Sequence, residues 1–258
     1  MNNFESSKLS LVQRLLYLVP LTVFIIVWHF VTYGDQQRQF IFSSPEKVFQ
    51  ALVRTIQSGE LLVNCQVTIM EALIGFALGT TVGAVVGLSL WYSRLVAQVS
   101  KPYVTALATV PIFALAPVII SWFGIDILSK IALAFLSTVT VAIVQSYQGA
   151  MSVDPRFLRM MQVVGATRWQ TFKSVVVPSS VIWVLNAMKL NIGLALMGAF
   201  IGEFISSEHG LGYMIVKASG LYDQATVFVG VLALIVIALV LTFLVEQLEN
   251  RLMRWKAL

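Results

Sequence analysis

Charged residues are scarce in this sequence. Only 11% of its 258 residues are Asp, Glu, Lys or Arg, whereas a soluble domain carries about 25%. Hydrophobic residues make up 58%, and the mean hydropathy is +0.86. Because 17 basic and 12 acidic side chains are too few to cover a soluble fold of this length, the composition argues against a soluble enzyme and against a disordered chain. It favours an all-α membrane protein that crosses the bilayer several times.

Residue types that carry catalytic and metal chemistry are also few. The single Cys65 cannot form an internal disulfide, and His29 and His209 are the only histidines, so we predict no metal site. The sequence has no Gly-x-x-x-x-Gly-Lys-Ser/Thr phosphate loop, no Ser/His/Asp pattern and no His-Glu-x-x-His motif. We therefore predict no catalytic residue, no bound cofactor and no ATP hydrolysis by this chain. No inverted repeat is visible, which weakens an interpretation as a secondary transporter.

Six apolar runs are long enough, or nearly long enough, to cross a bilayer as helices. They lie near residues 15–31, 68–91, 103–123, 127–147, 181–205 and 226–245. Strands of a β-barrel would instead show short segments of alternating polarity. We expect a single transmembrane domain over residues 1–258 with about six transmembrane helices.

The distribution of Lys and Arg predicts how these helices face the membrane, because cytoplasmic loops carry the excess of both. A cytoplasmic N-terminus leaves five cations outside and Lys189 within a span. The cations then inside are Lys8, Arg14, Arg94, Lys101, Arg156, Arg159, Arg168, Lys173, Arg251, Arg254 and Lys256. This bias predicts that both termini are cytoplasmic. The net charge of +5 therefore reflects membrane orientation, and we predict no nucleic-acid partner.

A helix start follows the first apolar run. Ser44 is suited to cap it, Pro45 to occupy its first position and Glu46 its first turn. Apolar residues then recur at helical spacing until Gly59. We predict an amphipathic helix near residues 45–58 on the outer surface, with a polar loop as the alternative.

The connection at residues 149–180 is too polar to lie in lipid and predicts two short helices. Asp154 followed by Pro155 is typical of a helix start, and Gly165 stands where a terminal glycine is expected. Thr167 and Gln170 fit a capping box that opens the second helix, and Pro178 is expected to end it. The apolar side chains share one face of each helix: Phe157, Met160, Met161 and Val164 on the first, Trp169, Phe172 and Val176 on the second.

Cations surround this apolar face, among them Arg156, Arg159, Arg168 and Lys173. An apolar surface ringed by charge suits the docking of a partner protein. It equally suits an interfacial helix that rests on anionic lipid. The residues alone leave both interpretations open.

Two patterns inside the apolar runs have both packing and functional interpretations. Gly75, Gly79, Gly83 and Gly87 form one stripe of small residues, which lets another helix approach closely. We interpret that stripe as helix packing rather than a ligand contact. Pro111 and Pro117 each free a carbonyl group and kink or break a helix. The segment between them either lines a translocation path or is kinked for packing.

Ionisable residues within or beside the runs are further candidates, because such residues are costly in a membrane and often functional. Lys189 lies in the fifth run, where it either faces the path or forms an ion pair. Glu203 near the end of that run and Glu71 near the start of the second are candidates for a gate or a structural partner. We include Lys189 and Glu203 with Pro111 and Pro117 as candidate path or gate residues.

Taken together, these motifs resemble a known family. The connection Val164–Phe172 is similar to the EAA loop of bacterial ABC-importer permeases. Further similarities, in the right order, are Gly75-Phe76, Val110-Pro111 through Ala116-Pro117, Trp122-Phe123-Gly124, Gly210 through Ile215, and Ser44-Pro45-Glu46. Together they resemble the nitrate/sulfonate/taurine branch of that family and cover nearly the whole chain after the first run.

The resemblance implies the type I ABC importer permease fold in the bacterial cytoplasmic (inner) membrane. It implies a second permease subunit, identical or different, an extracytoplasmic substrate-binding protein and two cytoplasmic ATPase subunits that hold ATP and Mg²⁺. It also implies that the connection is a coupling loop for the ATPases, and that the solute is a small anion such as nitrate, a sulfonate or a taurine-like compound. The implied coupling residues are Asp154, Phe157, Arg159, Met160, Met161, Val164, Gly165, Ala166, Thr167, Arg168 and Trp169.

The sequence departs from the family pattern at two places. Met70-Glu71 stands where the family has a basic residue early in the second span. The family's Glu-Ala-Ala falls on Arg159-Met160-Met161, which changes the charge and size of the surface offered to an ATPase. The rival hypothesis is a self-sufficient channel or secondary carrier of a small solute that uses Glu71, Lys189 and Glu203.

Overall fold

The computed structural model describes residues 11–253, with side chains from residue 19 onward. Lys8, Arg254 and Lys256, which entered the orientation argument, lie outside the described residues, as does the side chain of Arg14. Every regular element in the described part of the chain is helical. The elements are α1 (Leu11–Thr32), α2 (Gln36–Phe42), α3 (Pro45–Gln57), α4 (Glu60–Ser89), the 3₁₀ turn η1 (Leu90–Tyr92), α5 (Arg94–Thr109), α6 (Ile112–Phe123), α7 (Ile127–Met151), α8 (Pro155–Val163), α9 (Arg168–Thr171), the π-helical stretch η2 (Phe172–Val176), α10 (Val177–Ile205), α11 (Leu211–Gly220) and α12 (Gln224–Leu252).

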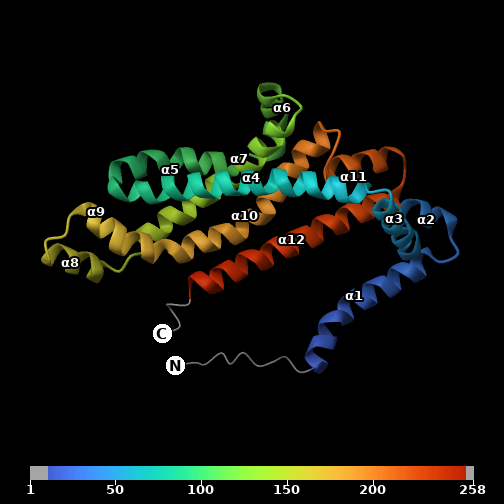
Figure 1. Ribbon diagram of the computed structural model, residues 1–258, viewed down its shortest axis with the longest axis horizontal. Helices are drawn as coiled ribbons and strands as arrows, with labels where there is room; N and C mark the ends of the chain where they lie inside the picture. Colours follow the sequence, from blue (N-terminus) through green and yellow to red (C-terminus); the bar gives the residue numbers. More distant parts are fainter. Residues whose placement is uncertain (1–10, 254–258) are drawn as a thin grey trace.

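Three long helices, α4, α7 and α10, pack along one another, and α12 lies beside them (Figure 1). The short helices α8 and α9 lie at one end of this bundle, and α3 and α11 lie at the other (Figure 1). We refer to these as the α8 end and the α11 end.

The glycine stripe of α4 lies against α7. A Cβ atom on Gly79 would lie 2.8 Å from the carbonyl oxygen of Phe135, and one on Gly83 would lie 2.6 Å from that of Val139. Gly75 and Gly87 meet α7 in the same way, at Ala134 and Ser146. Small residues let two helix backbones approach closely, which compensates for the absence of a hydrophobic driving force in lipid.

Four helical stretches of the described chain are long and apolar enough to cross a membrane: Glu60–Tyr92, Ile127–Met151, Arg168–Ile205 and Gln224–Leu252. A fifth crossing results if α5 and α6 are counted together. The sequence predicted about six spans. The structure shows an all-helical membrane protein with four to five candidate spans among residues 11–253.

The single helix expected near 103–123 is instead two helices that meet at 94°. Val110 is extended, with ψ of 124°, because proline disfavours a helical conformation in the residue before it. Pro111 is extended too, with ψ of 120°. Pro117 stays inside α6. Of the two prolines, only Pro111 breaks the helix.

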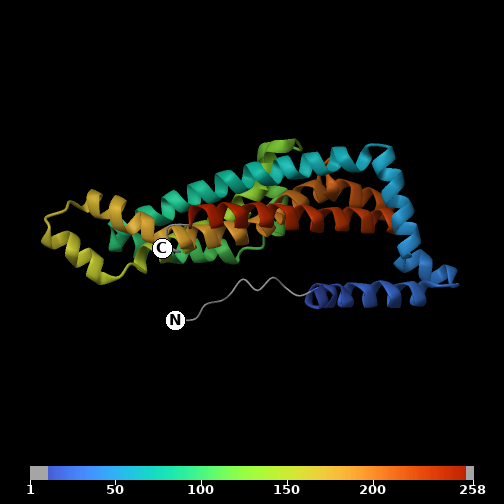
Figure 2. The ribbon, with the colours of Figure 1, turned by 60° about the horizontal axis from the view of Figure 1, so that its bottom comes forward.

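Helix α1 stands apart from the bundle and joins it through α2 and α3 (Figure 2). Its described apolar part, Val19–Thr32, is shorter than a full span. Only its last turns reach the bundle, where the Trp28 ring lies 5.0 Å from that of Phe228. Most of its large apolar side chains are therefore exposed in the single chain.

The expected end of the second short helix at Pro178 is wrong. Helix continues from Arg168 to Ile205 without a break, and residues Phe172–Val176 form a π-helical stretch directly before the proline. A local change to i→i+5 hydrogen bonding accommodates the missing N–H of Pro178 and the clash of its ring with the preceding turn. The connection is consequently continuous with a bundle helix.

Helix α3 begins as the sequence predicted. The Ser44 side chain accepts a hydrogen bond from the Lys47 N–H at 3.4 Å, and Pro45 is the first helical residue. Gly59 follows the helix with φ of +77°, a conformation that favours glycine. The buried Val48 and Ala51 pack α3 onto the bundle core.

Candidate functional site

The α8–α9 connection is built from the caps that the sequence predicted. The Asp154 carboxylate accepts from the Arg156 N–H at 2.8 Å. Thr167 and Gln170 form a reciprocal capping box, with bonds of 2.8 and 3.2 Å. Gly165 between the two helices has φ of +72°, which an L side chain adopts only with strain. These local bonds fix the angle between α8 and α9.

One face of the connection exposes apolar side chains. Phe157 is 56% exposed, Met160 63%, Val164 66% and Trp169 62%, whereas Met161 and Ala166 are half-buried. Arg159 and Arg168 are exposed too, and no ion pair is formed by either within residues 11–253. An exposed apolar surface with free cations is typical of a binding interface.

The base of the connection is anchored in the bundle. Phe172 lies at the centre of an aromatic cluster, with ring centroids 4.8 Å from Tyr92, 5.8 Å from Trp91 and 5.8 Å from Trp169. The buried Val153 and Val176 complete a small core there. A force applied to the exposed face would therefore reach the ends of α4, α7 and α10 through packed side chains.

The α11 end contains a buried polar network around Glu203. Its carboxylate accepts from the Thr68 hydroxyl at 2.6 Å and from the Gly212 N–H at 2.7 Å. Thr68 in turn accepts from the Leu211 N–H at 2.9 Å. Gly210 has φ of +105°, and a Cβ there would overlap the Glu203 carboxyl group. This network binds the start of α11 to α4 and α10.

Two further charged residues lie at this end: Glu71, which the sequence offered as a gate or a structural partner, and Lys130, to which it gave no role. Glu71 and Lys130 are 2% and 1% exposed, and the Lys130 ammonium group donates to the Ile125 and Asp126 carbonyl oxygens. The Glu71 carboxyl group interacts electrostatically with Glu203 and Lys130, and within residues 11–253 its Oε2 is buried without a hydrogen-bond partner. The signal was present in the sequence, since both residues interrupt apolar runs and buried charges need partners.

An ion pair joins α3 to the start of α12 at the same end. Arg54 donates to Asp223 at 2.7 Å, and Asp223 also accepts from the N–H of Thr226. Burial favours a higher pKa for Asp223, but the hydrogen bonds from Thr226 and Arg54 outweigh it and hold the pKa below its usual value.

The four candidate path residues are not brought together. Lys189 forms an ion pair with Glu249 of α12, and Glu203 belongs to the network described above. Pro111 and Pro117 are exposed on the surface of the single chain, at the bend and within α6. The buried side of α6 packs through Ala116 and Ile119 on Leu133 and Ile201.

Comparisons with known proteins agree on one family. The model of the family "Binding-protein-dependent transport system inner membrane component" matches residues 79–254. The chain is 31% identical over 239 residues to the riboflavin transport system permease protein RibX of Chloroflexus aurantiacus, covering 93% of this chain and 89% of that one. It is 28% identical over 234 residues to the putative aliphatic sulfonates transport permease SsuC of Bacillus subtilis, covering 91% and 85%. The fold is similar to a chain of the inward-facing MetNI methionine ABC transporter, with a TM-score of 0.69, 14% identity, and coverage of 77% of this chain and 98% of that one.

Proposed function

Because this chain belongs to the family of binding-protein-dependent transport system inner membrane components, we propose that its α8–α9 connection docks the ATPase subunits of an importer. The chain is the ABC permease component and is not itself the ATPase. It is a multi-pass protein of the inner membrane. In this proposal the α8 end is cytoplasmic, both termini are cytoplasmic and the α11 end faces outward.

The observation that carries this proposal is the exposed apolar face of the connection beside an anchored base. Phe157, Met160, Val164 and Trp169 are more than half exposed, although their neighbours Phe172 and Val176 are packed in the bundle. An ATPase that covered this face would bury the apolar area and pull on continuous helix through α9 and α10. Arg159 and Met160 would then favour an acidic, spacious docking groove on the ATPase.

Two further partners belong to the proposal. A second permease subunit, identical or different, would cover apolar surface that the single chain leaves exposed on α1, α5 and α6. An extracytoplasmic binding protein would deliver the solute to the α11 end. The surrounding lipid would cover the remaining apolar surface.

We place the translocation path along the α5–α6 segment between the two permease subunits. The break at Pro111 leaves backbone carbonyl groups without helical partners, which is tolerated at membrane depth where the backbone lines a cavity. Glu203 and Lys189 would hold the helices near the two ends of this path through the contacts described above.

The solute we propose is a small organic anion of the sulfonate type. The similarity to the sulfonate permease over 91% of the chain supports this class. Relatives differ in the solute that they are named for, since another one is a riboflavin permease. Binding measurements on the cognate binding protein with sulfonates and with riboflavin would decide between the two classes.

Reconstitution tests the importer function against the rival of a self-sufficient carrier. The purified chain in liposomes should show no solute flux until the ATPase, the binding protein and ATP are added. No other added compound should be able to replace ATP. Robust flux through the chain alone, without ATP, would contradict the proposal and favour the carrier.

A further inference from the structure

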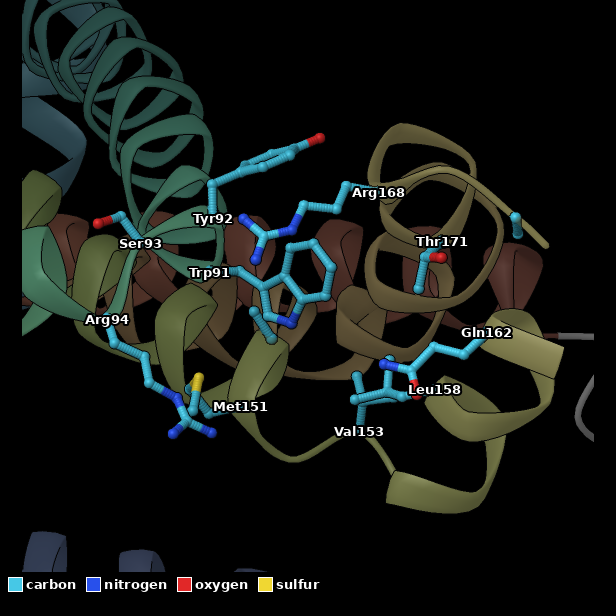
Figure 3. Close-up of a pocket in the computed structure, with 12 residues that line it drawn as sticks. Trp91, Tyr92, Ser93, Arg94, Met151, Val153, Leu158, Gln162, Arg168 and Thr171 are labelled. Carbon is cyan, nitrogen blue, oxygen red and sulfur yellow. The ribbon is translucent and has the colours of Figure 1, made fainter.

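A pocket of about 650 Å³ lies between the connection and the end of α4 (Figure 3). One wall comes from η1 and the start of α5, a second from the end of α7 and Val153, and the third from α8, α9 and the loop between them. Its lining residues are Trp91, Tyr92, Ser93, Arg94, Ala150, Met151, Val153, Leu158, Gln162, Ala166, Arg168 and Thr171.

The charge in this pocket is entirely positive. Arg94 and Arg168 line it from the two walls, and no carboxylate is among the lining residues. Figure 3 shows the Arg168 side chain reaching toward Trp91 and Tyr92 from the connection, and the Arg94 side chain on the other wall near Met151. Within residues 11–253, neither guanidinium group has an ion-pair or hydrogen-bond partner. Both remain free to bind an anion.

Two helix N-termini border the same pocket. Helix α5 begins at Arg94 and the continuous helix α9–α10 begins at Arg168. Their caps satisfy later N–H groups, since Ser93 accepts from Val96 and Thr167 from Gln170. The first N–H groups of each helix are left without a cap, and the positive ends of both helix dipoles favour an anion.

The length of α4 predicts that the pocket lies at the depth of lipid headgroups. Helix α4 has 30 residues and is therefore about 45 Å long, about the thickness of a bilayer with its headgroup regions. Trp91 and Tyr92 follow directly at its end, and these residue types are enriched at that interface.

We propose that this pocket binds a phosphate group, carried by an anionic phospholipid of the cytoplasmic leaflet or by a soluble phosphate compound. Two forked guanidinium groups suit phosphate oxygens, and basic pockets at the cytoplasmic surface bind anionic headgroups. A phosphate held by Arg94 and Arg168 would bridge the bundle and the connection. The choice of leaflet rests on the orientation in the proposed function, whereas the anion chemistry does not.

On α8 the pocket and the proposed docking face use different sides. Leu158 and Gln162 line the pocket and stand one turn apart on α8. Phe157 and Met160 belong to the exposed apolar face. Beyond α8, Arg168 lines the pocket and also belongs to the proposed docking surface, so the two sites adjoin at that residue.

The test is a titration of the purified full chain in detergent, followed by native mass spectrometry. Three arms use phosphatidylglycerol, phosphatidylcholine and inorganic phosphate. We expect one specific site for phosphatidylglycerol that phosphatidylcholine does not fill, with an affinity about fivefold lower in Arg94→Gln. If inorganic phosphate displaces the lipid from this site, the soluble compound is the source. If it does not, the lipid is the source.

Arg251→Gln is the matched control, because Arg251 is an exposed cation at the C-terminal end of α12. It should leave the affinity unchanged, and Arg94→Lys should restore part of the loss because it keeps the charge without the fork. An equal loss in Arg251→Gln would mean general surface attraction and would overturn the proposal. So would an unchanged affinity in Arg94→Gln, or a loss of ATPase binding in that variant with lipid binding intact. Because the readout is anion binding by the chain alone, failure of ATPase docking elsewhere leaves this result unaffected.

Discussion

The two ends of the bundle differ in whether their polar and apolar groups are buried with partners or exposed without them. At the α11 end, Glu203 is 1% exposed and its carboxylate bonds Thr68 and Gly212. At the α8 end, Phe157 and Trp169 are more than half exposed, and Arg159 and Arg168 beside them form no ion pair within the described chain. At the first end the Glu203 carboxylate has its partners within one chain, whereas the second end presents an apolar face and two arginines that lack partners within residues 11–253.

This difference separates stability from coupling. Buried polar networks are costly to disrupt because each orphaned group loses its partner in a low dielectric. Exposed apolar faces contribute little to the stability of the single chain and contribute affinity when a partner covers them. Substitutions in the buried Glu203 network should therefore destabilise the protein, and substitutions on the exposed face at the α8 end should uncouple it.

The largest effect is expected from Glu203→Ala. It leaves the Thr68 hydroxyl and the Gly212 N–H without their acceptor, which should lower the free energy of unfolding by about 3 kcal/mol. Equilibrium unfolding in detergent would measure the change. Glu208→Ala, at an exposed position of the same segment, serves as control. Equal stability of the two variants would mean that the network does not hold this end together.

The next effect concerns the helix contact that connects the two ends. Gly79→Ala would place a Cβ 2.8 Å from the Phe135 carbonyl oxygen and against Thr138, at a cost of about 1–3 kcal/mol. Gly193→Ala is the control, since nothing lies within 4 Å of its Cβ. Equilibrium unfolding in the same detergent should show a lower free energy of unfolding for Gly79→Ala alone. Similar free energies of unfolding for both variants would mean that the close approach of α4 and α7 does not contribute to stability.

Gly165→Glu tests whether the α8 end serves in coupling rather than in stability. The substitution adds strain of about 1–2 kcal/mol at φ of +72° and a negative charge beside the docking face. We expect the chain to fold and its affinity for the ATPase to fall about tenfold, as measured by co-purification and by solute-stimulated ATP hydrolysis. Gly34→Glu has the same φ of +72° and the same open surroundings, but it lies near the other end. If both variants lost coupling equally, backbone strain rather than docking would be the cause.

The smallest effect is expected at the exposed pair Arg54–Asp223. The folded-state pKa of Asp223 is lowered, so the pair stabilises the protein above the unfolded pKa of about 4. That contribution, under about 1 kcal/mol for a partly exposed pair, should disappear as the pH falls through the folded-state pKa. The thermal midpoint of the wild type should therefore drop more than that of Asp223→Asn over that acid range. Parallel curves would show that the pair contributes nothing.

Local signals in the sequence predicted the caps and turns well. Ser44, Asp154 and Thr167 cap the helices that they were expected to cap, because capping depends on residues only a few positions apart. The all-helical membrane class followed from composition alone. The continuous helix through Pro178 was missed because a π-helical stretch has no simple sequence pattern.

Long-range contacts explain the other differences. Glu71 and Lys130 interrupt apolar runs, but their proximity to Glu203 depends on how α4, α7 and α10 align, which spacing does not fix. Lys189 likewise pairs with Glu249, sixty residues further along the chain. The 94° bend at Pro111 decides whether four or five spans are counted. The remaining predicted span is not counted because the described apolar part of α1, Val19–Thr32, is shorter than a span.

Hydrogen exchange of the full chain in lipid nanodiscs, with and without the ATPase subunits, would show which end of the bundle the ATPases cover. We expect ATPase binding to slow exchange in peptides that span residues 154–171 and to leave residues 206–223 unchanged. Slowed exchange at residues 206–223 without any change at 154–171 would contradict this expectation.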